Sequence, residues 1–132
     1  LPPGDPIKKE NKEAYEMAGI GPKDIDLVEL HDCFATAEML HYGNLGLCKD
    51  EDAGNMLDQG NFNLGGKTPV NVSGGLLSKG HPLGATGIAN IYEVCTHLRG
   101  EAGKRQVEGA RIGLTHVIGL GSACGIHVLE KV

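Results

Sequence analysis

A glycine-rich stretch over residues 71–87, NVSGGLLSKGHPLGATG, constrains the fold of this chain more than any other feature. Glycine tolerates positive φ and lets another backbone or a ligand approach closely, so the stretch predicts turns beside a site. Pro82 suits a helix start, and the spacing predicts a helix from there to about Arg99. The apolar residues expected on its inward face are Ile88, Ile91, Tyr92, Cys95 and Leu98.

His81 stands just before this predicted helix. The positive end of a helix dipole disfavours an imidazolium, so the position favours a neutral ring. A neutral histidine in a glycine-lined hollow can act as a base or donate a hydrogen bond to a developing oxyanion. The competing interpretation is a plain strand-to-helix turn with an incidental histidine, because a glycine-rich turn is a weak signal by itself.

Length and composition limit the class of protein. A chain of 132 residues suits one domain, so we expect a single domain over residues 1–132. A net charge of −5, without a basic stripe and interleaved aromatic residues, argues against a nucleic-acid surface. No apolar run is long enough for a membrane span, and the first residues do not resemble a signal peptide. Because the chain does not begin with methionine, we expect a fragment or a processed product.

The cysteines indicate a reducing compartment. They are widely spaced and include no C-x-x-C pair, which favours free thiols. We therefore expect the cytoplasm, with the peroxisome as the alternative. The histidines and cysteines near residue 40 fit no structural zinc spacing, so neither a metal nor a cofactor is expected. The four cysteines are Cys33, Cys48, Cys95 and Cys124.

The order of the predicted elements is typical of a layered α/β domain. Residues 49–63 are predicted to form an exposed loop, and residues 68–72 either a short strand or an extended lead-in to the glycine-rich stretch. The other predicted elements are helices over 6–18 and 35–45, a buried strand over 25–30, and an antiparallel hairpin of strands 111–118 and 124–129.

Reactive side chains follow the predicted strands at three turns. His31 and Cys33 follow the first strand, His81 lies in the glycine-rich stretch, and His116 lies in the hairpin. In open α/β sheets ligands bind at the carboxyl ends of the strands, so these residues can converge there. Cys33, beside a histidine and a helix N-terminus, suits a thiolate acid/base. The alternative is that Cys33 is a small buried hydrophobe, as lone cysteines usually are.

Four segments occur in a fixed order: HDCF at 31–34, NVSGG at 71–75, GHPLGATG at 80–87 and LRGEAGKRQV at 98–107. This combination resembles the C-terminal half of a thiolase of the sterol-carrier-protein type, over about residues 25–131. The resemblance implies a thiolase-like layered α/β domain with a mixed sheet and helices on its faces. It also implies one half of a duplicated fold that lacks its first strand or strands.

Thiolases cleave or form 3-ketoacyl-CoA by Claisen chemistry through an acyl-cysteine intermediate. The resemblance thus implies an acyl-CoA C-acyltransferase of lipid metabolism, such as the 3-ketoacyl-CoA thiolase of fatty-acid β-oxidation or an acetyl-CoA acetyltransferase, with coenzyme A as a substrate. His81 is similar to the histidine that activates the nucleophilic cysteine and lines an oxyanion hole. His31 stands where most thiolases carry an asparagine that holds a water, and Cys33 resembles the second, proton-transferring cysteine of the sterol-carrier type.

The chain also departs from the family pattern. The acyl-accepting cysteine of thiolases lies in the N-terminal half, and nothing here matches it, so the isolated chain is expected to be inactive. The resemblance implies that half as a partner, within a homodimer or larger oligomer. Most thiolases carry Cys-x-Gly where this chain has His116 in the hairpin, so we transfer no role to Cys124. Weaker candidates for an oxyanion hole or substrate contact are His116, Gly119, Gly121, Ser73 and Gly74.

Two other functions stay open. Thiolase-like proteins also serve as aldolases on steroid side-chain CoA esters, and a cysteine at the nucleophile position of the other half would favour a thiolase over such a lyase. A non-catalytic module that binds acyl-CoA or supports a partner subunit is the third hypothesis. It predicts ordinary reactivity of Cys33 and His81, which the pH dependence of alkylation can test.

Overall fold

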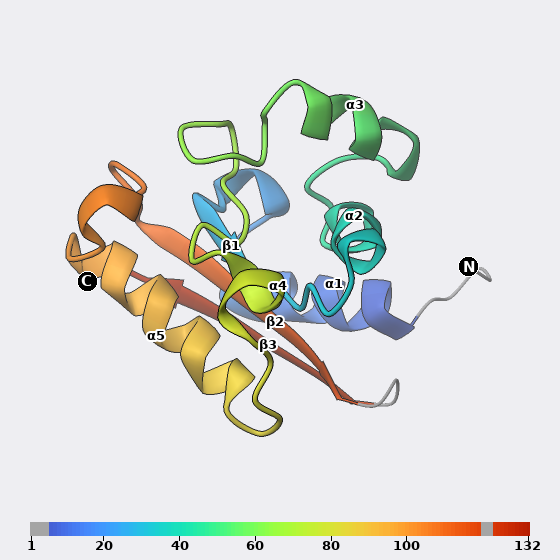
Figure 1. Ribbon diagram of the computed structural model, residues 1–132. Helices are drawn as coiled ribbons and strands as arrows, with labels where there is room; N and C mark the ends of the chain where they lie inside the picture. The colour runs from blue at the N-terminus through green and yellow to red at the C-terminus, as the bar shows by residue number, and fades with distance from the viewer. Residues whose placement is uncertain (1–5, 120–122) are drawn as a thin grey trace.

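A three-stranded mixed sheet lies at the centre of the computed structural model, which describes residues 6–119 and 123–132 (Figure 1). Strand β1 (Leu27–Glu29) runs parallel to β2 (Ile112–Gly119), and β2 pairs antiparallel with β3 (Ala123–Glu130). Val70 forms a single parallel bridge to Val28 on the other side of β1. The segment predicted over 68–72 is therefore an extended lead-in with one bridge, and the hairpin prediction is confirmed.

Helices α1 (Pro6–Ala18) and α5 (Thr86–Arg99) cover opposite faces of this sheet (Figure 1). Alternation along β1 divides the core between them. Leu27 packs with Val94 and Leu98 of α5, whereas Val28 packs in the core that contains Tyr15 of α1. The mixed sheet with helices on its faces, expected from the resemblance, is confirmed.

Helix α5 ends where predicted but begins later. Gly100 follows Arg99 with φ 77°, a conformation that stops the helix at low cost. The predicted start at Pro82 is wrong because Gly84 has φ 82°, which no α-helix accommodates. Residues 82–85 form a turn before α5, in which the Ala85 amide donates to the Pro82 carbonyl at 3.0 Å.

The predicted inward face of α5 is correct at Leu98, which is buried, and wrong at the exposed positions. Ile88 and Tyr92 are 71% and 68% exposed, and Cys95 is half-buried. The buried face combines Val94 and Leu98, which pack with Leu27 of β1, with polar side chains. Among these, Asn90 Nδ2 donates to the Glu29 carbonyl of β1 at 3.4 Å. The buried residues of α5 are Thr86, Asn90, Glu93, Val94, His97 and Leu98.

The segment predicted as an exposed loop over 49–63 contains structure. A 3-10 turn at Asp50–Asp52 leads into α3 (Ala53–Asp58), which packs against α2 (Ala35–Asn44). Phe62 is buried and stacks on Tyr42 of α2, with 3.8 Å between ring centroids. An unpredicted short helix, α4 (Gly75–Lys79), lies in the glycine-rich stretch. None of the helices in the described ranges is long and apolar enough to cross a membrane.

Candidate active site

Two segments that are far apart in the sequence meet at the carboxyl end of β1. One follows β1 and contains His31, Asp32 and Cys33; the other runs from Ser73 to Thr86 and contains α4. The rings of His31 and His81 lie edge to face, with 4.8 Å between their centroids and an interplanar angle of 83°. Cys33 is half-buried and directly precedes Phe34, the N-cap residue of α2. The structure thus brings together the two segments that carry the three predicted catalytic residues.

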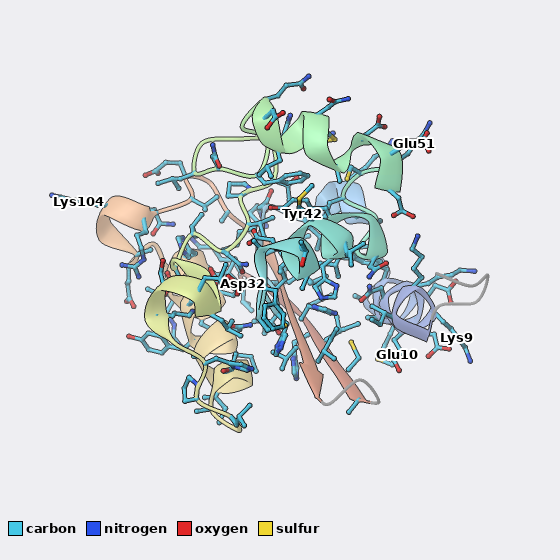
Figure 2. The ribbon with its side chains drawn as sticks, turned by 45° about the vertical axis from the view of Figure 1, so that its right-hand side comes forward. Lys9, Glu10, Asp32, Tyr42, Glu51 and Lys104 are labelled. Atoms are coloured by element: carbon cyan, nitrogen blue, oxygen red, sulfur yellow. The ribbon has the colours of Figure 1, made fainter. Side chains whose placement is uncertain are left out.

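Asp32 joins the two segments. Its buried carboxylate accepts a hydrogen bond from the Leu76 amide, 2.8 Å from Oδ1, and Figure 2 shows it between α2 and α4. Gly75 has φ 63°, and a Cβ at that position would overlap this carboxylate. Glycine at position 75 therefore permits both the turn and the close approach of α4 to the end of β1.

The hydrogen bonds of His81 favour one tautomer of its ring. Its Nδ1 lies 2.8 Å from Thr86 Oγ1, and that hydroxyl donates its own proton to the Pro82 carbonyl at 3.2 Å. The hydroxyl accepts from His81 when Nδ1 carries the proton. In the neutral ring Nε2 is then unprotonated, which leaves it as the nitrogen that can take a proton from a substrate or a nucleophile.

A row of imidazoles extends from His81 into the interior. Burial and then the nearby His81 lower the pKa of His31, with the charge of Asp32 acting in the opposite direction. Behind it, His116 is 0% exposed and lies edge to face with His41, at 4.6 Å between centroids. Burial, then His41 and His31, lower the pKa of His116 to about 3. His31 and His116 are therefore neutral near pH 7.

The weaker candidates lie in different environments. Neither ring nitrogen of His116 has a hydrogen-bond partner within the described residues. The Gly74 amide donates to the Asn71 carbonyl at 2.9 Å, and the amide and hydroxyl of Ser73 both donate to Glu29. Gly119 lies at the exposed end of β2, and Gly121 lies outside the described residues. A role in substrate binding stays a prediction for all five positions.

The sequence interpretation did not identify Glu29, Lys79 and Thr86. Thr86 orients His81, as described above. Glu29 is 1% exposed, and burial raises its pKa, while its bonds to Ser73 and the charge of Lys79 act against that rise. A carboxylate between two apolar residues near the end of a predicted buried strand is the signal that could have identified Glu29.

Comparisons with known proteins match this chain to one family. The family described as "Thiolase C-terminal domain-like" matches residues 5–131. Sterol carrier protein 2 of Rattus norvegicus is 55% identical over 119 residues, which are 90% of this chain and 22% of that protein. Acetyl-CoA acetyltransferase of Methanothermobacter thermautotrophicus is 50% identical over 121 residues, 91% of this chain and 32% of that protein.

A solved structure gives a similar match. The "Ltp2-ChsH2(DUF35) aldolase" superposes with a TM-score of 0.83 at 25% sequence identity, covering 95% of this chain and 32% of that chain. The chain therefore spans between a fifth and a third of the length of the proteins it matches.

Proposed function

The chain belongs to the thiolase C-terminal domain-like family, and from that premise we propose that it is the C-terminal catalytic domain of an acyl-CoA C-acyltransferase. The observation that carries the proposal is the edge-to-face contact of His31 and His81, on segments that also bring Cys33 to the end of β1. The similarity to an acetyl-CoA acetyltransferase over 91% of the chain supports the same reaction class.

In the first half of the proposed reaction, His81 Nε2 takes the proton of a nucleophilic cysteine supplied by the other half of the protein. The sulfur attacks the 3-keto carbon of the substrate, and the bond between C2 and C3 breaks. The electron pair moves into an enolate of acetyl-CoA, whose oxygen accepts hydrogen bonds from the imidazole N–H groups of His81 and His31. The Cys33 thiol then protonates C2, and acetyl-CoA leaves.

In the second half, the Cys33 thiolate takes the proton of coenzyme A. The CoA sulfur attacks the acyl-cysteine, and the shortened acyl-CoA leaves as the cysteine sulfur regains its proton from His81. Both proton carriers return to their starting states, so no cofactor is required. A neutral His31 suits this cycle because an imidazole N–H can donate to an oxyanion without adding a charge.

We also propose that the domain packs against an N-terminal thiolase half in a longer polypeptide. The exposed side chains of Ile88 and Tyr92 on α5 form part of the apolar surface that such a half would cover. The full-length protein would be a homodimer or larger oligomer that acts on acyl-CoA. We place it in the cytoplasm, with the peroxisome as the alternative.

An aldolase is the second candidate function. The solved aldolase that covers 95% of this chain favours it, and the same fold can hold an acyl-CoA ester for cleavage of a different carbon–carbon bond. The two functions differ in chemistry: a thiolase needs a cysteine nucleophile from the other half and free coenzyme A, whereas an aldolase needs neither.

Thiolysis of acetoacetyl-CoA by the full-length protein tests the proposal. We expect the wild-type protein to cleave the substrate and Cys33→Ala to lose at least about a hundredfold in rate, as for a missing general acid/base. Cys95→Ala is the matched control, because Cys95 is half-buried on α5 and is expected to change the rate by less than about twofold. The isolated 132-residue chain is expected to show no turnover.

The possible results separate the three functions. Full activity of Cys33→Ala would contradict the role of Cys33. A wild-type protein that leaves acetoacetyl-CoA intact but cleaves a 3-hydroxyacyl-CoA into an aldehyde or ketone and a shorter CoA ester would favour the aldolase. Cleavage of neither substrate, with ordinary alkylation of Cys33 and His81, would favour a non-catalytic module.

A further inference from the structure

A buried carboxylate lies beneath the segment that carries His81. Glu29 Oε1 accepts the Ser73 amide at 3.1 Å, and its Oε2 accepts the Ser73 hydroxyl at 2.6 Å. Lys79 Nζ donates to the same hydroxyl oxygen at 2.7 Å and lies 3.5 Å from Glu29 Oε2. The three side chains form a closed triangle, which we call the Glu29 network.

The charges in this network depend on each other. The Glu29 side chain is 1% exposed and that of Lys79 is 29% exposed, so water screens their attraction only partly. Leaving one charge of a buried pair without the other is strongly unfavourable. Glu93 of α5 also acts on Glu29, and because its charge has the same sign, it increases the need for the cation.

The network anchors one end of an exposed segment. Lys79 is the last residue of α4, and residues 80–85 that follow are exposed. The Gly80 amide donates to the Leu76 carbonyl at 3.0 Å, and at the other end Thr86 binds His81. With few contacts in between, the position of His81 depends on the anchors before and after it.

We propose that Glu29 and Lys79 are positioning residues of the site, and that their charge pair, joined through Ser73, holds the segment carrying His81 against His31. A displacement of a catalytic group by about 1 Å can cost about a hundredfold in rate. The catalytic consequence rests on the proposed function, whereas the position of His81 is measurable independently of it.

A second buried charge pair supplies a matched control. Glu93 is buried on α5 and binds Arg105, with Arg105 Nε 2.9 Å from Oε1 and a terminal nitrogen 3.1 Å from Oε2. Arg105 lies in the connector after α5, beyond the end of the helix that is remote from His81. Its removal also leaves a buried carboxylate without its cation. It breaks the contacts with Glu93 and leaves the hydrogen bonds of Ser73, Lys79 and His81 in place, although Glu93 and Arg105 both act electrostatically on Glu29.

The test compares Lys79→Met, Glu29→Gln and the double variant with Arg105→Met in the full-length protein. Carbethoxylation of His81 by diethyl pyrocarbonate, followed by peptide mass spectrometry, reports the environment of its imidazole. We expect Lys79→Met and Glu29→Gln to change this rate at least about threefold and to lower kcat for acetoacetyl-CoA about tenfold or more, with a smaller effect on KM. The double variant is expected to recover part of both losses, because neither charge is left alone.

The controls make the outcomes decisive. Arg105→Met is expected to lower stability while leaving the His81 rate and kcat within about twofold of wild type. Unchanged His81 reactivity in folded Lys79→Met would overturn the proposal, and so would an equal change in Arg105→Met. If Glu29→Gln does not fold, Lys79→Met carries the test, because the remaining carboxylate can take a proton. A wild-type protein that does not cleave acetoacetyl-CoA contradicts the proposed function alone, and the His81 rates still decide whether the network positions His81.

Discussion

The two buried glutamates of this domain differ in what depends on them. Glu93 accepts two hydrogen bonds from the guanidinium of Arg105, which lies in the connector after α5. Other hydrogen bonds also hold this connector, among them the one from Gln106 Nε2 to the His97 carbonyl at 2.9 Å. Glu29 contacts Lys79 directly at 3.5 Å and also through the Ser73 hydroxyl, below the exposed residues 80–85. Figure 2 places Asp32, beside that segment, near the middle of the molecule, and Lys104 of the connector at its edge. The pair of Glu93 and Arg105 thus reinforces a connector that other hydrogen bonds already hold. The pair of Glu29 and Lys79, in our proposal, positions His81.

The largest difference between the candidate site and the connector after α5 is expected in how stability depends on acid pH. Burial holds the pKa of His116 at about 3, below its ordinary value of 6.5, and the pKa of His97 near the connector is also lowered by burial. The unfolded chain therefore binds these protons first as pH falls. The free energy of unfolding therefore falls as pH falls from 6.5 toward 3. For His116 the loss is about 5 kcal/mol.

Denaturant unfolding of the full-length protein against pH measures this loss. We expect His116→Phe to reduce the loss of unfolding free energy at acid pH more than His97→Gln does. His97 Nδ1 accepts the Val107 amide at 3.1 Å and Glu93 lies nearby, whereas His116 has no hydrogen-bond partner within the described ranges. An equal reduction by both variants would show that the imidazole row contributes no more to acid sensitivity than the connector does.

Glycines in the two regions offer a second, smaller contrast. Gly75→Ala places a Cβ against the Asp32 carboxylate at φ 63°, and we expect about 3 kcal/mol of destabilisation together with a loss of thiolysis. Gly100→Ala has open space at φ 77° and is expected to cost about 1 kcal/mol, with activity retained. Urea unfolding and the acetoacetyl-CoA assay measure both variants. Equal losses of activity would contradict the special role of the close approach at Gly75.

The smallest expected effect is at the connector pair. Arg105→Lys loses the two-point contact with Glu93, but the Arg105 side chain is 48% exposed, so we expect a loss of about 1 kcal/mol or less and unchanged thiolysis. Thermal unfolding beside an activity assay measures this. A loss as large as that of Gly75→Ala would mean that the connector, too, constrains the site.

Local sequence signals predicted much of the fold. The glycine after Arg99 ended α5 correctly, and the apolar run over residues 25–30 identified the strand whose carboxyl end carries His31 and Cys33. That placement predicted that His31 and His81 can converge, because ligand sites gather at the carboxyl ends of strands, and the two rings are in contact.

Other features depend on tertiary partners that spacing does not show. Periodicity on α5 indicated an apolar face, but not that the opposite face is the buried one. On that face Asn90 binds the Glu29 carbonyl of β1, and Glu93 binds Arg105 of the connector. Phe62, in the loop after α3, is buried and stacks on Tyr42 of α2, so the polar local composition concealed it. The Glu29 network joins a strand to a segment more than forty residues later, and only the fold reveals it.

Deuterium exchange at C2 of acetyl-CoA tests most directly whether this domain supplies thiolase chemistry. The full-length protein is incubated with acetyl-CoA in D2O, and the mass of acetyl-CoA is followed with time. If Cys33 moves a proton on and off C2, the wild-type protein and Cys95→Ala incorporate deuterium, and Cys33→Ala does so at least about a hundredfold more slowly. Exchange by Cys33→Ala at the wild-type rate, or no exchange by the wild-type protein, would contradict the account.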